Sequence, residues 1–261
     1  MALIKLSMPD YLSAPGISKS GLDQIAKSPA HYQAWKAEQP EPTKAMMFGS
    51  AVHCALLEPE LFAGAYAVSP EVDRRTKDGK AEYAAWEAAN GGKVALSMPD
   101  YSKILAMRDS FQSHSLTRGT VGASVTEHSL LWTDEKTGAQ CKARPDIVLD
   151  GMVMDLKTTE DASPRAFERS AANFRYHCQA AFYLRAMTAD TGILHTKFLF
   201  IAIEKTPPYA IAVYEASPDM IRMGADCNNA DLARYAKAKT TGVWDSYPET
   251  VQQLSLPPWA L

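Results

Sequence analysis

Apolar positions in the first 118 residues recur with the three-to-four-residue spacing of helices, and polar or proline-rich stretches interrupt them. Residues 1–17 contain two prolines and a glycine and are predicted to form an extended arm. Ser18 or Ser20 can cap the short helix that follows. Further helices are predicted from Pro29, with Ser28 as the cap, and over 45–57, 81–89 and 99–113, separated by a break at 38–44 and a charged loop at 73–80.

Beyond this helical part, the pattern changes to short apolar and β-branched runs, which are typical of strands. Residues 124–133 and 140–149 are each predicted to form one strand, and residues 152–158 a third. Asp150-Gly151, between the last two, is a strong signal for a two-residue hairpin. We therefore expect three antiparallel strands in the centre of the chain.

The rest of the chain returns to alternating helices and strands. A helix is predicted over 164–187, strands over 195–205 and 209–216, and a helix over 217–239. The hexapeptide LSMPDY occurs at 6–11 and at 96–101, but the flanking sequences differ, so no structural repeat is expected. The whole pattern predicts one α/β (α+β) domain over 1–261, with a mainly helical part at 1–118, a sheet-and-helix core at 119–216 and a final helix and tail at 217–261.

Composition narrows the possible function classes. The formal net charge is −3, so binding to nucleic acid would need a local basic patch or a metal site. No apolar run approaches the ~18 residues that span a membrane, and the first residues lack the features of an export signal. The four cysteines lack the C-x-x-C spacing of zinc or iron–sulfur sites, so we expect reduced thiols in a cytoplasmic protein.

The predicted hairpin brings two aspartates and a lysine together. Asp146 lies four positions before the turn and Asp155 four positions after it, which places them opposite each other in the ladder. Lys157 lies two residues beyond Asp155 and shares its face of the strand. Neighbouring carboxylates repel each other, and a divalent cation such as Mg²⁺ or Mn²⁺ relieves that repulsion. The lysine could orient a water molecule or stabilise charge on a phosphate.

The plainer alternative is an exposed hairpin with acidic and basic side chains on its solvent face. The tripeptide Asp-x-Lys alone is weak evidence against that alternative. The ordered set Pro145-Asp146, eight residues, then Asp155-Leu156-Lys157 is more specific, and it favours a catalytic metal site.

These residues resemble the PD-(D/E)-x-K motif of nucleases. More narrowly, the chain resembles the nuclease domain of RecE-type exonuclease VIII, a relative of lambda exonuclease and of the RecB-like nucleases. The resemblance implies a restriction-endonuclease-like core, in which helices flank a mixed central sheet. It also includes the stretches ISKSGLDQIAKSPAHYQ (17–33), GSAVHCALLEPELF (49–62), RRTKDGK (74–80) and YHCQAAFY (176–183).

The resemblance implies which residues bind the metal and act in catalysis. It implies that Lys157 is the catalytic lysine and that Asp155 stands where many relatives have glutamate, a side chain one methylene longer. His53 alone, on an apolar helix, would more often be a core histidine. The residues that match metal ligands of the family, or lie where relatives place a residue near the metal, are His53, Glu127, Asp146, Asp155 and the backbone carbonyl of Leu156.

Gln179 and Tyr183 match the Q-x-x-x-Y motif of RecB-like nucleases. They lie four residues apart and would share one face of a helix. The motif implies that both lie along the cleft, where they contact the DNA backbone or support Lys157. A buried tyrosine with a neighbouring amide is the alternative that the residues themselves leave open.

Two segments are candidates for binding DNA phosphates. Ser18, Lys19 and Ser20 precede a helix N-terminus, whose free N–H groups bind anions, and relatives bind a 5′-phosphate near such a segment. Plain helix capping is the alternative. The second candidate is the densest basic loop, which contains Arg74, Arg75, Lys77 and Lys80 and could equally be a solvated loop.

The resemblance implies a Mg²⁺-dependent exonuclease, in which Mn²⁺ is expected to substitute for Mg²⁺. Relatives degrade the 5′-ended strand of linear double-stranded DNA and leave 3′ tails for a single-strand annealing recombinase of the RecT or Red-beta type. They form ring-shaped homo-oligomers, so a trimer or tetramer of bacterial or phage origin is expected. The alternatives are a Cas4-like or other RecB-like nuclease that acts on single strands or flaps, and a catalytically inactive DNA-binding relative.

Overall fold

A five-stranded mixed sheet forms the centre of the structure, a computed structural model that describes residues 3–38, 41–149 and 151–256. The parallel pair is β7–β8, and the other three neighbouring pairs are antiparallel. This sheet, flanked by helices, confirms the predicted mixed α/β fold class. In spatial order the strands are β3 (Val125–Thr126), β6 (Ile147–Leu149), β7 (Met152–Thr159), β8 (Phe198–Glu204) and β9 (Ile211–Glu215).

The hairpin between β6 and β7 has the predicted register. Ile147 pairs with Met154, so Asp146, the residue before it, is opposite Asp155, the residue after Met154. Asp150 of the predicted turn is outside the described residues, and Gly151 has a φ of +77°, which suits a glycine in a tight turn.

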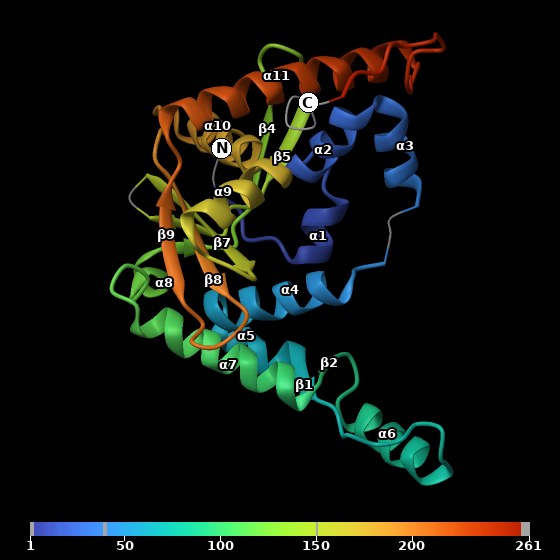
Figure 1. The fold of residues 1–261 in the computed structure, drawn as a ribbon, viewed down its shortest axis with the longest axis vertical. Coiled ribbons are helices and arrows are strands. Elements are labelled where there is room, and N and C mark those ends of the chain that lie inside the picture. Colours follow the sequence, from blue (N-terminus) through green and yellow to red (C-terminus); the bar gives the residue numbers. More distant parts are fainter. Residues whose placement is uncertain (1–2, 39–40, 150, 257–261) are drawn as a thin grey trace.

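Helices cover both faces of the sheet. Val153 on β7 packs into one apolar cluster with residues of α2, α10 and α11, whereas Leu156 packs into a second cluster with residues of α4 and α7. Figure 1 shows α10 and α11 above the sheet and α4 and α7 below it. These helices are α2 (Lys19–Lys27), α4 (Lys44–Leu57), α7 (Met98–Ser113), α10 (Tyr176–Thr191) and α11 (Pro218–Thr241).

The second half of β7 extends beyond its partner β6. The ladder between them covers only Met152 to Met154 of β7, whereas the ladder between β7 and β8 continues to Thr159. Helix α4 contacts β7, and a Cβ added to Gly49 would lie 3.9 Å from Thr158 Oγ1. Beyond Met154, β7 therefore no longer pairs with β6, and this part of the strand lies close to α4.

Two predicted strands are each interrupted in the structure. The segment 124–133 divides into β3 and β4 (Leu130–Thr133), because Glu127 adopts a φ of +52° that ends the strand. The segment 140–149 divides into β5 (Gln140–Ala143) and β6, with Pro145 in the connection between them. Strands β4 and β5 pair with each other in a separate two-stranded antiparallel sheet, and Cys141 of β5 also forms an isolated parallel bridge with Ile17.

The single helix predicted over 164–187 is also wrong. The structure has α9 (Pro164–Asn173) and then α10, and Arg175 between them has a φ of +53°. A non-glycine residue with positive φ cannot continue a right-handed helix, so the chain turns there.

Three further boundaries bear on the predictions. The predicted arm contains α1 (Met8–Ser13), which Ser7 caps, so its description as extended is wrong there. The predicted loop 73–80 ends early, because α6 (Lys77–Ala89) begins inside it. The other elements are α3 (Pro29–Ala37), which Ser28 caps as predicted, α5 (Pro59–Ala65), α8 (Thr120–Ala123) and the parallel pair β1 (Tyr66–Val68) and β2 (Val94–Leu96).

Helix α6 projects away from the rest of the molecule, as Figure 1 shows at its lower right. None of the described helices is both long and apolar enough to cross a membrane. The division of the chain into a single domain with three parts stays a prediction.

Candidate active site

Asp155 and Lys157 form an ion pair on the face of β7 that looks toward α10. Lys157 Nζ lies 2.5 Å from Asp155 Oδ2. Gln179 on α10 joins both partners, because its amide nitrogen donates to Asp155 Oδ1 (2.6 Å) and its carbonyl oxygen accepts from Lys157 Nζ (2.8 Å). The amide therefore fixes the positions of the carboxylate and of the ammonium relative to each other.

Asp146 lies on the β6 side of β7. Its Oδ2 accepts a hydrogen bond of 2.7 Å from the backbone N–H of Leu156. The N–H and C=O of one strand residue point to the same side, so the Leu156 carbonyl also faces the edge that β6 leaves free. This is the carbonyl that the resemblance implies as a metal ligand.

His53, Glu127 and Asp146 form a compact group beside this edge. One ligand atom of each lies within 4.8 Å of the other two. His53 Nδ1 is 3.5 Å from Asp146 Oδ2 and 3.9 Å from Glu127 Oε1. The imidazole comes from α4, one carboxylate from the break after β3 and the other from the residue before β6. The three groups thus converge from separate parts of the chain.

Arg144, which the sequence analysis did not single out, orients Glu127. Arg144 Nε donates to Glu127 Oε2 at 2.7 Å, and its Nη1 donates to the backbone oxygen of Leu6. The backbone N–H of Glu127 also donates to the carbonyl of Asp146 (3.0 Å). The strand break at Glu127 therefore brings this carboxylate close to His53. The signal in the sequence was a charged residue, Arg144, directly before Pro-Asp in a segment predicted to form a strand.

The charges of the site perturb one another. Burial, together with the charge of Asp155, raises the pKa of Asp146 to about 7. Burial opposes the charged form of His53, but Asp146 and then Glu127 outweigh it and raise the pKa of the imidazole to about 9. Burial likewise opposes the charge of Lys157, but Asp155 raises the pKa of the ammonium above its usual value. The cluster therefore holds more negative charge than its surroundings neutralise, which favours a cation.

A divalent cation suits the donor set of His53, Glu127 and Asp146. Carboxylate oxygens are the preferred ligands of Mg²⁺ and Mn²⁺, and imidazole is compatible with Mn²⁺. Asp155 is outside this three-residue group, and its two oxygens contact Lys157 and Gln179. Its predicted role as a direct metal ligand stays a prediction.

A cavity of about 570 Å³ lies on the α10 side of Lys157. Gln179 and Tyr183 line it from α10, and Lys19 and Ser20 line it from α2. Burial raises the pKa of the Tyr183 hydroxyl well above its usual value. The residues of the Q-x-x-x-Y motif and part of the segment that is predicted to bind a phosphate thus line the same cavity.

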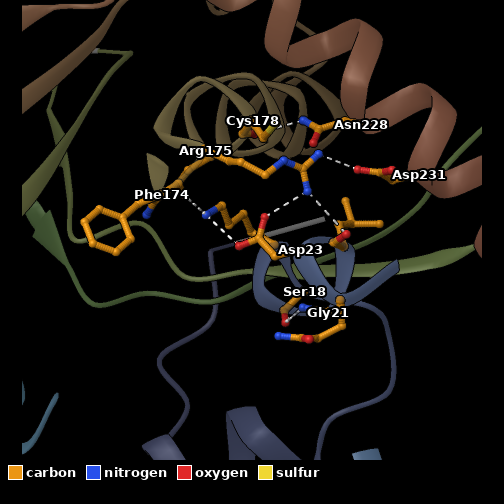
Figure 2. Close-up of polar contacts among 12 residues, drawn as sticks. Ser18, Gly21, Asp23, Phe174, Arg175, Cys178, Asn228 and Asp231 are labelled. Atoms are coloured by element: carbon orange, nitrogen blue, oxygen red, sulfur yellow. Dashed lines mark hydrogen bonds and ion pairs between the residues drawn. The ribbon is translucent and has the colours of Figure 1, made fainter. Parts of the chain in front are cut away.

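Ser18 differs from its two neighbours. Its hydroxyl accepts from the N–H of Gly21 (3.2 Å) and caps α2, a contact that Figure 2 shows. It borders a different cavity, of about 320 Å³, and is absent from the lining of the one that contains Lys157. Lys19 donates to the carbonyl of Phe174 and pairs with Asp23, each at 2.7 Å.

Tyr176 is a further residue of the site that the sequence analysis did not assign. Its ring centre lies 4.7 Å from Lys157 Nζ, a cation–π contact. The signal available was its position three residues before Gln179, in the first turn of the same helix.

The predicted basic DNA-binding residues Arg74 and Arg75 precede α6, and Lys77 begins it, on the part of the chain that projects away from the sheet (Figure 1). Arg75 Nη2 pairs with Asp73 at 2.9 Å, and Arg74 lies over the ring of Tyr83 at 3.9 Å. The structure therefore does not bring them together with Lys157, and their role in binding DNA stays a prediction.

A second group of potential metal ligands lies between α10 and α11. His177, Cys178 and Cys227 have ligand atoms within 4.8 Å of one another. Thiols prefer softer metals than Mg²⁺. Within the described residues, the group that suits the predicted Mg²⁺ is thus the one that contains Glu127 and Asp146.

Comparisons with known proteins bear on the fold and the family of the chain. A crystal structure described as a candidate exonuclease from Eubacterium rectale matches with a TM-score of 0.66 and 14% identity, over 97% of this chain and 96% of that chain, which shows a similar fold. A structure described as SSO0001 matches with 18% identity over 70% of this chain and 85% of that chain, but its TM-score of 0.30 is too low to show a shared fold. No curated protein matches the chain. Residues 18–257 match the model of a family described as "PDDEXK-like domain of unknown function (DUF3799)", and the chain belongs to this family.

Proposed function

We propose that the chain is a divalent-metal-dependent nuclease that degrades DNA. One observation carries the proposal: Asp146, Asp155 and Lys157 occupy one side of the β6–β7 hairpin, beside His53 and Glu127. Carboxylates and an imidazole that can hold a divalent cation, with a lysine close by, are groups that can promote the hydrolysis of a phosphodiester.

The residues of the site would have different roles in the reaction. Lys157 presents a fixed positive charge to the cavity, where it would bind a phosphate oxygen and stabilise the negative charge that develops there. Gln179 and Asp155 hold this ammonium in place, so it needs little reorganisation during the reaction. A divalent cation held by His53, Glu127 and Asp146 would supply Lewis-acid activation and charge neutralisation.

The finer parts of the proposal rest on the resemblance. We infer an exonuclease that degrades the 5′-ended strand of linear duplex DNA and leaves 3′ tails for an annealing recombinase. Support for exonuclease action also comes from the description of the similar Eubacterium rectale structure. A ring-shaped homo-oligomer belongs to the same inference.

The test is digestion of a linear duplex that carries a fluorophore at the 5′ end of one strand. Degradation from that end releases the label at once as a mononucleotide, whereas degradation from the 3′ end leaves it on a shortening strand. We expect early release with Mg²⁺ or Mn²⁺ and none with a chelator, and a covalently closed circle should resist digestion.

Two variants connect the activity to the site. Asp155→Asn should abolish release of the label, while Asp109→Asn, which alters an exposed carboxylate paired with Arg108, should retain it. Full activity of a folded Asp155→Asn protein would contradict the proposed site. Rapid cutting of the closed circle would replace exonuclease action with endonuclease action.

A further inference from the structure

Phe174 is the one exposed phenylalanine of the eight in the chain, all of which are in the described part. It is 61% exposed, at the end of α9. Single exposed apolar residues are common, so exposure alone has no functional meaning. The position of this residue is what distinguishes it, because Phe174 lines the cavity that contains Lys157.

Two helices, α2 and α11, hold the backbone that carries Phe174. Arg175, in its left-handed conformation, binds Asp231 of α11 (2.5 Å) and Asp23 of α2 (3.1 Å), and Lys19 of α2 donates to the carbonyl of Phe174. Figure 2 shows the Arg175 side chain pointing toward these carboxylates, while the ring of Phe174 points the other way. Polar contacts therefore hold the turn on two sides, and its aromatic ring is left outside the core.

The ring lies close to the proposed site of reaction. Phe174 stacks on Tyr176 with ring centres 5.8 Å apart and an interplanar angle of 25°, and Tyr176 contacts Lys157 Nζ. A single aromatic ring thus separates the exposed Phe174 from the lysine that is proposed to bind the phosphate.

The charges of the cavity suit a nucleotide strand. Its lining contains four basic residues and only one acidic residue, although the whole chain has a net charge of −3. A strand of nucleic acid carries phosphates on one side and flat bases on the other, and proteins bind such strands with cations and exposed aromatic rings together. The basic residues that line the cavity are Lys19, Lys27, Lys157 and Arg175, and the acidic one is Asp23.

We propose that Phe174 forms a nucleobase-binding subsite, on which the base of the nucleotide next to the scissile phosphate stacks. The inference rests on the proposed nuclease function and adds a requirement to it. A base inside a duplex has neighbours on both faces, whereas the base at the end of a strand has one face free to lie on this ring. The enzyme would therefore engage the terminal nucleotide of the strand that it degrades.

The experiment combines a protein variant with a substrate that lacks one base. Phe174→Ala is compared with wild type on linear duplexes that have either a normal or an abasic nucleotide at the 5′ end, with Mg²⁺. Stacking is worth about 5- to 150-fold in affinity per base. We expect Phe174→Ala to raise KM by that factor on the normal duplex and to leave kcat nearly unchanged, because stacking stabilises the ground state and the transition state alike.

The abasic substrate gives the decisive comparison. The KM of wild type should rise by the same factor on the abasic duplex. The KM of Phe174→Ala should be no higher on the abasic duplex than on the normal one, because ring and base are two halves of one contact. Phe174→Tyr should retain the wild-type KM, Phe174→Leu should not, and Leu194→Ala, which alters a residue 76% exposed, should behave as wild type. Independent losses from the variant and from the missing base would overturn the subsite.

The failure of this inference is distinguishable from failure of the proposed function. If wild type degrades DNA and Phe174→Ala has the wild-type KM on the normal duplex, the subsite is absent and the nuclease function stands. If wild type with Mg²⁺ or Mn²⁺ degrades neither substrate, both are overturned. A 2-aminopurine base at the 5′ end adds a binding readout, since its fluorescence should fall on stacking with wild type but not with Phe174→Ala.

Discussion

Lys157 and Asp155 form an ion pair of 2.5 Å on one face of β7, with both side chains largely removed from solvent. Asp155 is only 1% exposed, and Asp146 lies opposite it across the hairpin. A buried carboxylate is costly without a partner, and a second carboxylate nearby adds to the cost. The lysine therefore stabilises the apo fold as well as serving the proposed reaction.

Removal of the lysine should show this structural role. We expect Lys157→Met to lower the free energy of unfolding by about 3 kcal/mol, because it leaves the charge of Asp155 buried and unpaired. The double variant Asp155→Asn/Lys157→Met should recover most of that loss. Urea denaturation measures both values, with Arg222→Met, in an exposed pair with Asp219, as a control that should change stability by at most ~0.5 kcal/mol. Equal losses in the single and double variants would contradict the coupling.

The proposed reaction gives Lys157 a second, kinetic signature. Lys157→Ala should retain DNA affinity within a few-fold, because the other basic residues of the cavity remain, but single-turnover cleavage at saturating DNA should fall by at least about 100-fold. Binding is measured by fluorescence anisotropy with a chelator present. If affinity collapsed and the single-turnover rate were unchanged, Lys157 would only clamp a phosphate.

Gln179 should act as a positioning residue. Gln179→Leu keeps the size of the side chain but removes both hydrogen bonds, so Lys157 and Asp155 lose the amide that fixes their relative positions. Because small misplacements of reacting groups are costly, we expect kcat to fall about 100-fold with little change in KM. Gln112→Leu, on the exposed side of α7, is the matched control. A rise in KM at constant kcat would instead place Gln179 in substrate binding.

The hairpin of the site was predictable because its information is local. Asp150-Gly151 sets the turn, the turn sets the register, and the register brings Asp146 opposite Asp155. The start of α1 could also have been predicted, because Ser7-Met8-Pro9-Asp10 repeats the capping sequence that begins α7. The prediction of an extended arm did not take this sequence into account.

The missed features are single residues in unusual conformations. Glu127 and Arg175 adopt positive φ values, which a sequence normally signals with glycine or asparagine. Tertiary contacts hold both: Arg144 binds the Glu127 carboxylate, and Asp231 binds the Arg175 guanidinium. Because such contacts join distant parts of the chain, periodicity predicted continuous elements at both breaks.

The group of His53, Glu127 and Asp146 should bind Mn²⁺. We expect His53→Gln to weaken Mn²⁺ binding at least ~10-fold, since even residues that only support metal ligands have effects of that size. Titration calorimetry or Mn²⁺ electron paramagnetic resonance measures the affinity directly, without DNA and without turnover. His114→Gln is the control, because it alters a histidine that is outside the group. Unchanged affinity in His53→Gln would remove this residue from the metal site.

Ser18 and Ser20 should separate into a structural and a substrate-binding residue. Ser18 caps α2 through the N–H of Gly21, so Ser18→Ala should cost about 1 kcal/mol of stability and leave the preference for a 5′-phosphate nearly unchanged. Ser20 is exposed and lines the cavity with Lys157, so Ser20→Ala should leave stability within ~0.5 kcal/mol and narrow the rate difference between 5′-phosphate and 5′-hydroxyl ends. A lost hydrogen bond to a charged phosphate corresponds to about a tenfold change in that ratio.

Initial rates on the two end chemistries, for wild type, both single variants and the double variant, measure this separation. Metal affinity should stay constant throughout, because the group of metal ligands consists of His53, Glu127 and Asp146. The double variant should combine the stability loss of Ser18→Ala with the narrowed preference of Ser20→Ala, since the two effects have different physical origins. An unchanged end preference in Ser20→Ala would mean that the N-terminus of α2 is built for helix stability alone, and the 5′-phosphate would then have to be bound elsewhere in the cavity.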